Sequence, residues 1–417
     1  MTPSSLKIAD PDAGPSRLRW VMIAFAFAAT VINYLDRQAL SITAPILTKE
    51  FNMNDETYGL VLLAFMLAYT IMNGLSGPFI DRVGTKVGYA CCMAWWSTAG
   101  ILHVFTRGPF SLGVFRFLLG MGEAGNWPSA VKLVSEWFPA KERALASGIF
   151  NSGAAIGAVA APPLITWLVV MWGWQEAFVI VGALGYVWLI GWWFVYRIPA
   201  YAARAAREKR IPVAQLLQTR FVPFFTLSKA FIDPVWYFYI FWIPKYLSTV
   251  HHLSLIEIGK LAWIPFLTAD IGDLAGGGLS AWLIHRGISV PRARKIGMGL
   301  FALLMTSAIG AVFAPSVGWA LACVSVATFG YTGYSANMLA LPADVFPKSV
   351  VASVYGFASM GSGFGGMLFS WLTGRMIDRH GYEPVLFGYG LLPLVALAVL
   401  LLLCGPLRRD ERFDHAT

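Results

Sequence analysis

Charged residues are scarce in this sequence, and the shortage limits the kind of protein it can encode. Only 13% of its 417 residues are charged, about half the share found in ordinary soluble domains. A soluble fold needs a mostly polar surface, and a disordered chain combines low hydrophobicity with high charge. The composition therefore excludes both classes.

Residues arranged for metal, disulfide or nucleophilic chemistry are also missing. The four cysteines, Cys91, Cys92, Cys323 and Cys404, lie in apolar runs without the spacing of zinc sites or disulfide frameworks. Neither an H-E-x-x-H nor a G-x-S-x-G motif occurs. The letters of a dinucleotide loop occur at Gly361–Gly366, but inside an apolar segment, where close helix packing explains them. We therefore expect no enzyme, no cofactor and no metal.

Long apolar segments, in contrast, are abundant. Hydrophobic residues make up 57% of the chain, and a membrane-spanning helix needs about 20 mostly apolar residues. The segments that qualify are 18–47, 57–80, 87–106, 109–137, 144–171, 176–197, 220–248, 256–285, 294–313, 316–345, 350–379 and 384–404. We predict an all-α membrane protein of twelve transmembrane helices in two six-helix bundles.

The longest break between these segments divides the chain into two parts. It covers 198–219, is rich in Lys and Arg, and separates predicted bundles at 18–197 and 220–404. Short tails at 1–17 and 405–417 flank the bundles. Most of the 31 Lys and Arg residues fall on the side that holds both tails, and the positive-inside rule makes that side, with the linker, cytoplasmic. This bias also explains the net charge of +9 without a nucleic-acid partner.

The two halves repeat short patterns in the same order. Gly74–Arg82 resembles Gly278–Arg286, and Glu136–Pro139 resembles Asp344–Pro347. Three glycines keep the same spacing in each half: Gly148, Gly153 and Gly157, and then Gly356, Gly361 and Gly365. Internal repeats are the signature of secondary transporters, whose binding site lies near the membrane midplane between the halves.

Charged residues inside the predicted spans mark candidate functional positions, because charge is costly at membrane depth. Asp36 and Arg37 lie within the first span. In the fourth, the spacing of Arg116, Glu123 and Trp127 predicts that they share one helical face. A basic and an acidic group on one face can bind an anion at one level and a proton at another.

The loop after the second predicted span carries a family signature. Its residues Gly77, Asp81, Arg82, Gly84 and Lys86 match the pattern Gly-x-x-x-Asp-Arg-x-Gly-x-Arg/Lys. In this loop the chain resembles the major facilitator superfamily. Glycine permits a tight turn and close helix contact there. The resemblance implies that the loop is a gating latch and binds no substrate.

Longer segments narrow the resemblance to the anion:cation symporter branch of this superfamily, and within it to bacterial hexuronate transporters. They are Asn33–Arg37, Arg116–Pro128, Ser135–Arg143, Asp233–Pro244 and Ala269–Gly278. The similarity covers essentially the whole chain. It implies a monomeric carrier in a bacterial inner membrane. Such a carrier imports a sugar-acid anion, such as D-glucuronate or D-galacturonate, driven by a proton gradient through alternating access.

The same resemblance implies roles for individual residues. Asp36 and Glu123 match the proton-coupling carboxyls of the branch, and Arg37 matches the ligand of the substrate carboxylate. Arg116 matches an arginine that pairs with an acid or the substrate. Further substrate-site candidates, from the resemblance or from their capacity to stack on a ring or bind hydroxyls, are Tyr34, Tyr69, Asn126, Trp127, Trp236, Tyr237 and Asn337. A guanidinium offers a carboxylate two parallel hydrogen bonds, which agrees with these roles.

The roles of two pairs of charged residues, and the identity of the transported anion, each have more than one interpretation. Lys229 and Asp233 are four residues apart and can simply pair on one helix. Asp270 and Asp273 form either a structural network with Lys229, or a polar wall for sugar hydroxyls, or a sodium site. Another carboxylate, such as an aldonate, aldarate, aromatic acid or dicarboxylate, fits the same fold. A membrane sensor would need an appended domain, and no catalytic constellation supports a membrane enzyme.

Overall fold

The computed structural model describes residues 17–138, 143–197, 215, 217–346, 348–405 and 407. Within these residues the regular structure is helical, without strands. The first half contains α1 (Leu18–Glu50), α2 (Asp55–Val83), α3 (Thr85–Leu102), η1 (His103–Phe105), α4 (Pro109–Glu123), α5 (Asn126–Trp137), α6 (Arg143–Trp172) and α7 (Trp174–Val195). The second contains α9 (Phe221–His251), α10 (Leu255–Leu261), α11 (Ile264–His285), α12 (Val290–Met305), η4 (Thr306–Ala311), α13 (Val317–Val345), α14 (Lys348–His380) and α15 (Tyr382–Leu403).

Each predicted span coincides with one helix or with two consecutive helices. The span predicted at 109–137 is divided into α4 and α5 by Ala124 and Gly125. This stretch is rich in glycine, which has a low helix propensity. A Cβ on Gly122 would lie 2.7 Å from the Cβ of Trp96 in α3, so the close approach requires glycine. Nearly all of the predicted tails and most of the predicted linker lie outside the described residues.

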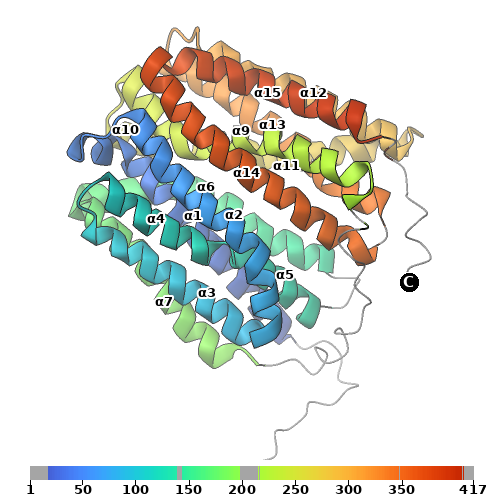
Figure 1. The fold of residues 1–417 in the computed structure, drawn as a ribbon, viewed down its shortest axis with the longest axis horizontal. Coiled ribbons are helices and arrows are strands. Elements are labelled where there is room, and N and C mark those ends of the chain that lie inside the picture. Colours follow the sequence, from blue (N-terminus) through green and yellow to red (C-terminus); the bar gives the residue numbers. More distant parts are fainter. Residues whose placement is uncertain are drawn as a thin grey trace, which may run out of the picture.

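The helices form two bundles that follow the two halves of the sequence. In the first half α1 packs on α6, α2 on α4 and α3 on α7; in the second α9 packs on α14 and α15, and α11 and α12 on α13. Figure 1 shows the blue-to-green helices on one side of the molecule and the yellow-to-red helices on the other. The bundles meet where α2 contacts α14, α1 contacts α9 and α6 contacts α10.

The repeated glycines occupy equivalent packing positions in the two bundles. Gly153 and Gly157 bring α6 close to α1, and Gly361 and Gly365 bring α14 close to α9. At Gly157 a Cβ would lie 2.8 Å from the Cβ of Tyr34 and 2.9 Å from the Val31 carbonyl oxygen. The sequence repeat is therefore also a repeat of helix packing.

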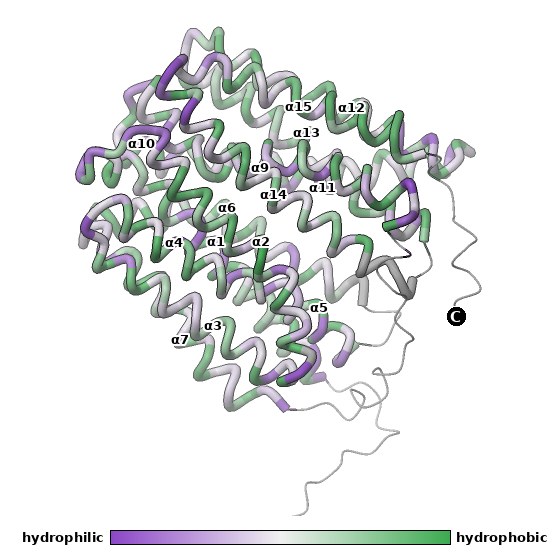
Figure 2. Tube along the Cα trace, in the orientation of Figure 1, coloured by the Kyte–Doolittle hydropathy of each residue, from purple (hydrophilic) through white to green (hydrophobic). Residues whose placement is uncertain are grey.

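Apolar side chains cover much of the outside of the helices. Five of the described helices have, by length and composition alone, a stretch able to cross a membrane: Leu18–Glu50, Asp55–Ile80, Ala146–Trp172, Trp174–Val195 and Tyr382–Leu403. Figure 2 shows apolar residues along the helices and polar ones gathered near many of their ends. Exposed large side chains such as Phe194 and Leu402 suit contact with lipid.

Candidate functional site

The centre of the candidate site is an ion pair between α1 and α4. The Arg37 guanidinium donates two hydrogen bonds to Glu123 Oε2, from Nε at 3.1 Å and from Nη2 at 2.9 Å. Arg37 Nη2 also lies 3.4 Å from Asn33 Oδ1, one turn earlier in α1. Both charged side chains are buried. The structure thus joins two residues that sequence reasoning placed in one site.

Three aromatic rings surround the Arg37 guanidinium. Its carbon lies 4.9 Å from the Tyr69 ring centre, 5.3 Å from Tyr34 and 5.5 Å from Phe65. A cation above ring faces gains cation–π attraction. These contacts fix the guanidinium between α1 and α2.

Arg116 and Asp36 lie beside this pair without a hydrogen-bond partner of their own. All three Arg116 side-chain nitrogens, Asp36 Oδ2 and Glu123 Oε1 are buried and unpartnered among the described residues. Arg116 contacts the Phe65 ring at 4.6 Å and lies within electrostatic range of Asp36 and Glu123. Two arginines and two carboxyl groups therefore share one enclosed region, with hydrogen-bonding capacity to spare.

The second half contributes another buried pair of charged residues. On α9, Lys229 Nζ lies 2.8 Å from Asp233 Oδ2, which confirms the predicted pairing. The Tyr331 hydroxyl of α13 donates to Asp233 Oδ1 at 3.1 Å. The ring of Tyr331 stacks on Trp236, with ring centres 5.1 Å apart.

Tyrosines connect this second group to Arg37. Tyr237 lies within electrostatic range of Asp233 on one side and of Arg37 and Tyr69 on the other. Its hydroxyl is 3.3 Å from Ser362 Oγ of α14. Tyr237 therefore lies near charged and aromatic groups of both halves: Arg37 and Tyr69 from the first and Asp233 from the second.

Three predicted substrate-site residues, Asn126, Trp127 and Asn337, make hydrogen bonds or ring contacts within their own bundle. Asn126 accepts a hydrogen bond from the Tyr89 hydroxyl and donates to Thr30, between α5, α3 and α1. Trp127 packs edge-on against Phe150 of α6. α4 ends at Glu123 and α5 begins at Asn126, so the predicted face that includes Arg116, Glu123 and Trp127 crosses a break between two helices.

Asn337 likewise serves helix packing within the second half. Its amide donates to the carbonyl oxygens of Gly276 and Gly333, at 3.1 and 2.9 Å. Its oxygen accepts from Ser280 and lies 3.5 Å from Arg294 Nη1. Sequence patterns cannot separate this use of a buried amide from substrate binding, because both place a polar residue inside a span.

The two acidic residues of α11 do not join Lys229. Among the described residues neither Asp270 nor Asp273 has an ion pair, and Asp273 is exposed. The structure therefore gives no support to the structural network with Lys229. No group of three or more His, Cys, Asp or Glu side chains suited to a metal occurs in the described part of the chain.

The segment that carries the family signature, Gly77 to Lys86, includes a tight turn between α2 and α3. Gly84 has φ +85°, a left-handed conformation that favours glycine. Gly77 and Asp81 belong to the last turns of α2, Arg82 is exposed, and Lys86 Nζ lies 4.9 Å from the Trp193 ring centre. This geometry agrees with the predicted turn, while the latch role stays a prediction.

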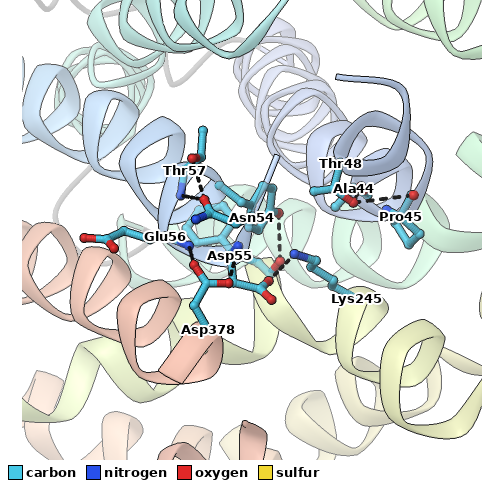
Figure 3. Close-up of polar contacts among 11 residues, drawn as sticks. Ala44, Pro45, Thr48, Asn54, Asp55, Glu56, Thr57, Lys245 and Asp378 are labelled. Carbon is cyan, nitrogen blue, oxygen red and sulfur yellow. Dashed lines mark hydrogen bonds and ion pairs between the residues drawn. The ribbon is translucent and has the colours of Figure 1, made fainter. Parts of the chain in front are cut away.

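At the opposite end of α2, polar contacts join the two halves (Figure 3). Asp55 forms an ion pair with Lys245 of α9. Asp378, near the end of α14, accepts hydrogen bonds from the backbone amides of Asp55 and Glu56. The Tyr58 hydroxyl donates to the Phe241 carbonyl oxygen at 2.9 Å. Sequence reasoning missed this cluster, which we call the closed-end cluster (Asp55, Tyr58, Lys245 and Asp378).

The contacts between α2 and α14 extend from that end to about the middle of α2. Gly59 and Thr70 of α2 lie directly against Ser370 and Gly363 of α14. Farther along, a Cβ on Gly74 or Gly77 of α2, or on Gly356 of α14, would have no described neighbour within 4 Å. The two helices therefore pack where α2 begins and separate where it ends.

Comparison with protein families places this architecture in a known group. The profile described as Major Facilitator Superfamily matches residues 26–370. A solved D-xylose–proton symporter has a TM-score of 0.77 at 14% identity, covering 93% of this chain and 98% of its own. A bacterial homologue of the human lysosomal transporter Spinster, in an inward-facing occupied conformation, has a TM-score of 0.76 at 20% identity. That match covers 97% of this chain and 98% of the other.

Curated relatives are more similar in sequence. The hexuronate transporter of Escherichia coli K12 is 34% identical over 88% of this chain and 90% of its own length. The galacturonate transporter of Dickeya chrysanthemi is 34% identical over 74% of this chain and 95% of its own. The hexuronate transporter of Bacillus subtilis is 29% identical over 91% of this chain and 93% of its own.

Proposed function

This chain belongs to the Major Facilitator Superfamily, and we propose that it imports a hexuronate anion, such as D-glucuronate or D-galacturonate, together with protons. Secondary transport follows from the family, so the protein is a transporter and not an enzyme. The cargo is inferred from the hexuronate and galacturonate transporters that match most of its length. The observation that carries the proposal is the buried Arg37–Glu123 pair beside the unpartnered Arg116.

Arg37 is the proposed ligand of the substrate carboxylate. Its guanidinium already makes two hydrogen bonds to one carboxylate oxygen, that of Glu123. A uronate carboxylate offers the same acceptor geometry. The rings of Tyr34 and Tyr69 beside the guanidinium offer apolar faces for a sugar ring and hydroxyls for its hydrogen bonds.

Competition for Arg37 provides the proposed coupling. With Asp36 and Glu123 ionised, the two arginines are balanced by two carboxylates. Protonating Glu123 removes its charge and releases Arg37 for the substrate, and the region then has a net positive charge that favours an anion. Asp36 lies within electrostatic range of both Glu123 and Arg116, so its protonation acts in the same direction.

Alternating access gives the proposed transport cycle. We place the chain as a monomer in a bacterial inner membrane, with both termini in the cytoplasm. The closed-end cluster then faces outward, and α2 and α14 separate toward the cytoplasm. In this orientation Arg82, Lys86 and Arg292 lie on the cytoplasmic side, as the positive-inside rule requires.

Uptake into proteoliposomes tests this proposal. Labelled D-glucuronate and D-galacturonate are offered with an inwardly directed proton gradient, with and without an ionophore. Accumulation that collapses with the ionophore is the expected result. Accumulation that follows a sodium gradient would overturn proton coupling. If folded protein takes up neither uronate but accumulates an aldonate, aldarate or aromatic acid, the cargo assignment is wrong.

A further inference from the structure

The Lys229–Asp233 pair has no part in the proposed proton coupling. Only 8% of the Lys229 side chain and 9% of the Asp233 side chain are exposed. Removing two charges from water costs several kcal/mol per ion, and well-packed apolar residues are often as stable in such a place. The stability of α9 alone therefore does not account for a buried ion pair at this position.

Several contacts hold the Asp233 carboxylate in one orientation. Its Oδ2 faces Lys229, and its Oδ1 accepts from the Tyr331 hydroxyl. Tyr331 is in turn stacked on Trp236. Lys229 Nζ lies 5.6 Å from the Tyr355 ring centre. The charge of Lys229 is thus neutralised by a carboxylate that α13 holds in place.

Two tyrosines lie within electrostatic range of both this pair and the Arg37 site. Tyr237 is within electrostatic range of both Arg37 and Asp233, and Tyr355 is within range of Lys229 and of Tyr69, which covers Arg37. A substrate whose carboxylate is bound at Arg37 would direct its far end toward Lys229 and Asp233.

We propose that Asp233 determines substrate specificity by neutralising Lys229, so that the site accepts sugar monoacids and excludes diacids. This inference rests on the proposed function. The pair offers one ammonium donor and one carboxylate acceptor, which suit the hydroxyl groups at the neutral end of a uronate. A second carboxylate at that end finds no free cation and is repelled by Asp233.

The experiment compares two acids with the same carbon chain. D-galacturonate has one carboxylate, and galactarate (a meso compound) has one at each end. Inhibition of labelled galacturonate uptake is measured with both acids for the wild type, Asp233→Asn, Lys229→Gln and the double variant. Thermal melting of each purified protein shows whether it is folded.

Asp233→Asn is expected to lower the galactarate inhibition constant about tenfold relative to that of galacturonate, since it leaves Lys229 free for a second carboxylate. The double variant has no such cation, so its galactarate inhibition constant is not expected to fall in this way. Lys229→Gln leaves Asp233 as an unpaired anion and is expected to weaken galacturonate binding about tenfold. In the double variant galacturonate binding should return to within about threefold of wild type.

The outcomes separate the two proposals. A folded wild type that takes up neither uronate overturns both the proposed function and this inference. If the wild type transports galacturonate while folded Asp233→Asn leaves the ratio of the two acids unchanged, the specificity role of Asp233 alone is overturned. If Asp233→Asn does not fold, Lys229→Gln and the double variant decide: equal galacturonate binding in both would overturn the inference.

Discussion

Asp378 binds the first backbone amides of α2 from across the interface between the two halves. Its two carboxylate oxygens accept from the amide of Asp55 at 2.7 Å and from that of Glu56 at 2.6 Å. The amide end of a helix carries partial positive charge, which a carboxylate stabilises. This helix cap belongs to the other bundle, so it exists only while the two bundles are together at this end.

Removing the Asp378 carboxylate should therefore weaken closure of this end. We expect Asp378→Ala to cost the closed arrangement about 1 kcal/mol, the usual value of a helix N-terminal cap. Pulsed electron–electron double resonance measures the distance between nitroxide labels at two exposed positions, Lys49 of α1 and Val250 of α9. Compared with the unsubstituted background, Asp378→Ala should show a larger fraction of molecules with a long distance between the labels. The labels require a background without the native cysteines.

Glu56→Gln is the matched control for this measurement. Glu56 contributes its backbone amide to Asp378, and Figure 3 shows its side chain directed away from that carboxylate. Its distance distribution should match that of the unsubstituted background. An Asp378→Ala distribution identical to that of the control would show that the cap does not hold this end closed.

Arg37→Ala should remove most of the affinity for a uronate. Hydrogen bonds to charged groups contribute about 1.5–3 kcal/mol, so the loss of one bidentate contact predicts a weakening of about 100-fold or more. Isothermal titration calorimetry of the purified protein with D-galacturonate measures this affinity. Arg107→Ala, at an exposed position before α4, should bind as wild type does. Unchanged affinity in Arg37→Ala would exclude Arg37 from the substrate site.

Glu123→Gln should separate transport from proton coupling. Glutamine keeps the size of the side chain and an acceptor oxygen for Arg37, but it cannot release a proton. Uptake driven by a proton gradient should disappear, while exchange of internal for external uronate continues. This exchange is measured in proteoliposomes with equal pH on both sides of the membrane. Normal accumulation by this variant would remove Glu123 from the coupling mechanism.

The sequence predicted local features well and contacts between the halves poorly. The helices at the predicted spans and the glycine repeat follow from apolar length and spacing, and the structure shows both. The Asp378 cap joins residues 323 positions apart in the chain. Single charges at the ends of spans have no periodic pattern that distinguishes a partner in the other half from an ordinary loop charge. For the same reason the pairing of Asp55 with Lys245 was not anticipated.

Buried amides show a second limit of sequence reasoning. Asn126 and Asn337 both lie inside predicted spans and are fully buried, as a substrate-site residue would be. Their hydrogen bonds join neighbouring helices of one bundle. Which direction a polar side chain takes depends on the rotation of its helix.

Gly157→Ala should impair both stability and substrate binding, because helix α6 packs closely against α1 beside Tyr34. The new Cβ would lie 2.8 Å from the Cβ of Tyr34, and overpacking of this kind typically costs about 1–3 kcal/mol. Any shift of α1 also moves Arg37, three residues farther on. We expect a lower melting temperature together with weaker galacturonate binding.

Gly148→Ala provides the control on the same helix, since a Cβ there would have no described neighbour within 4 Å. Alanine favours a helix over glycine by about 1 kcal/mol, so this variant should melt at the same temperature or higher. Gly365→Ala repeats the clash in the other bundle, against the Ala230 carbonyl oxygen of α9. It should destabilise the protein as Gly157→Ala does, because the two glycines occupy equivalent places in the repeat. A stable Gly365→Ala variant beside an unstable Gly157→Ala variant would show that the two bundles do not depend on the same helix packing.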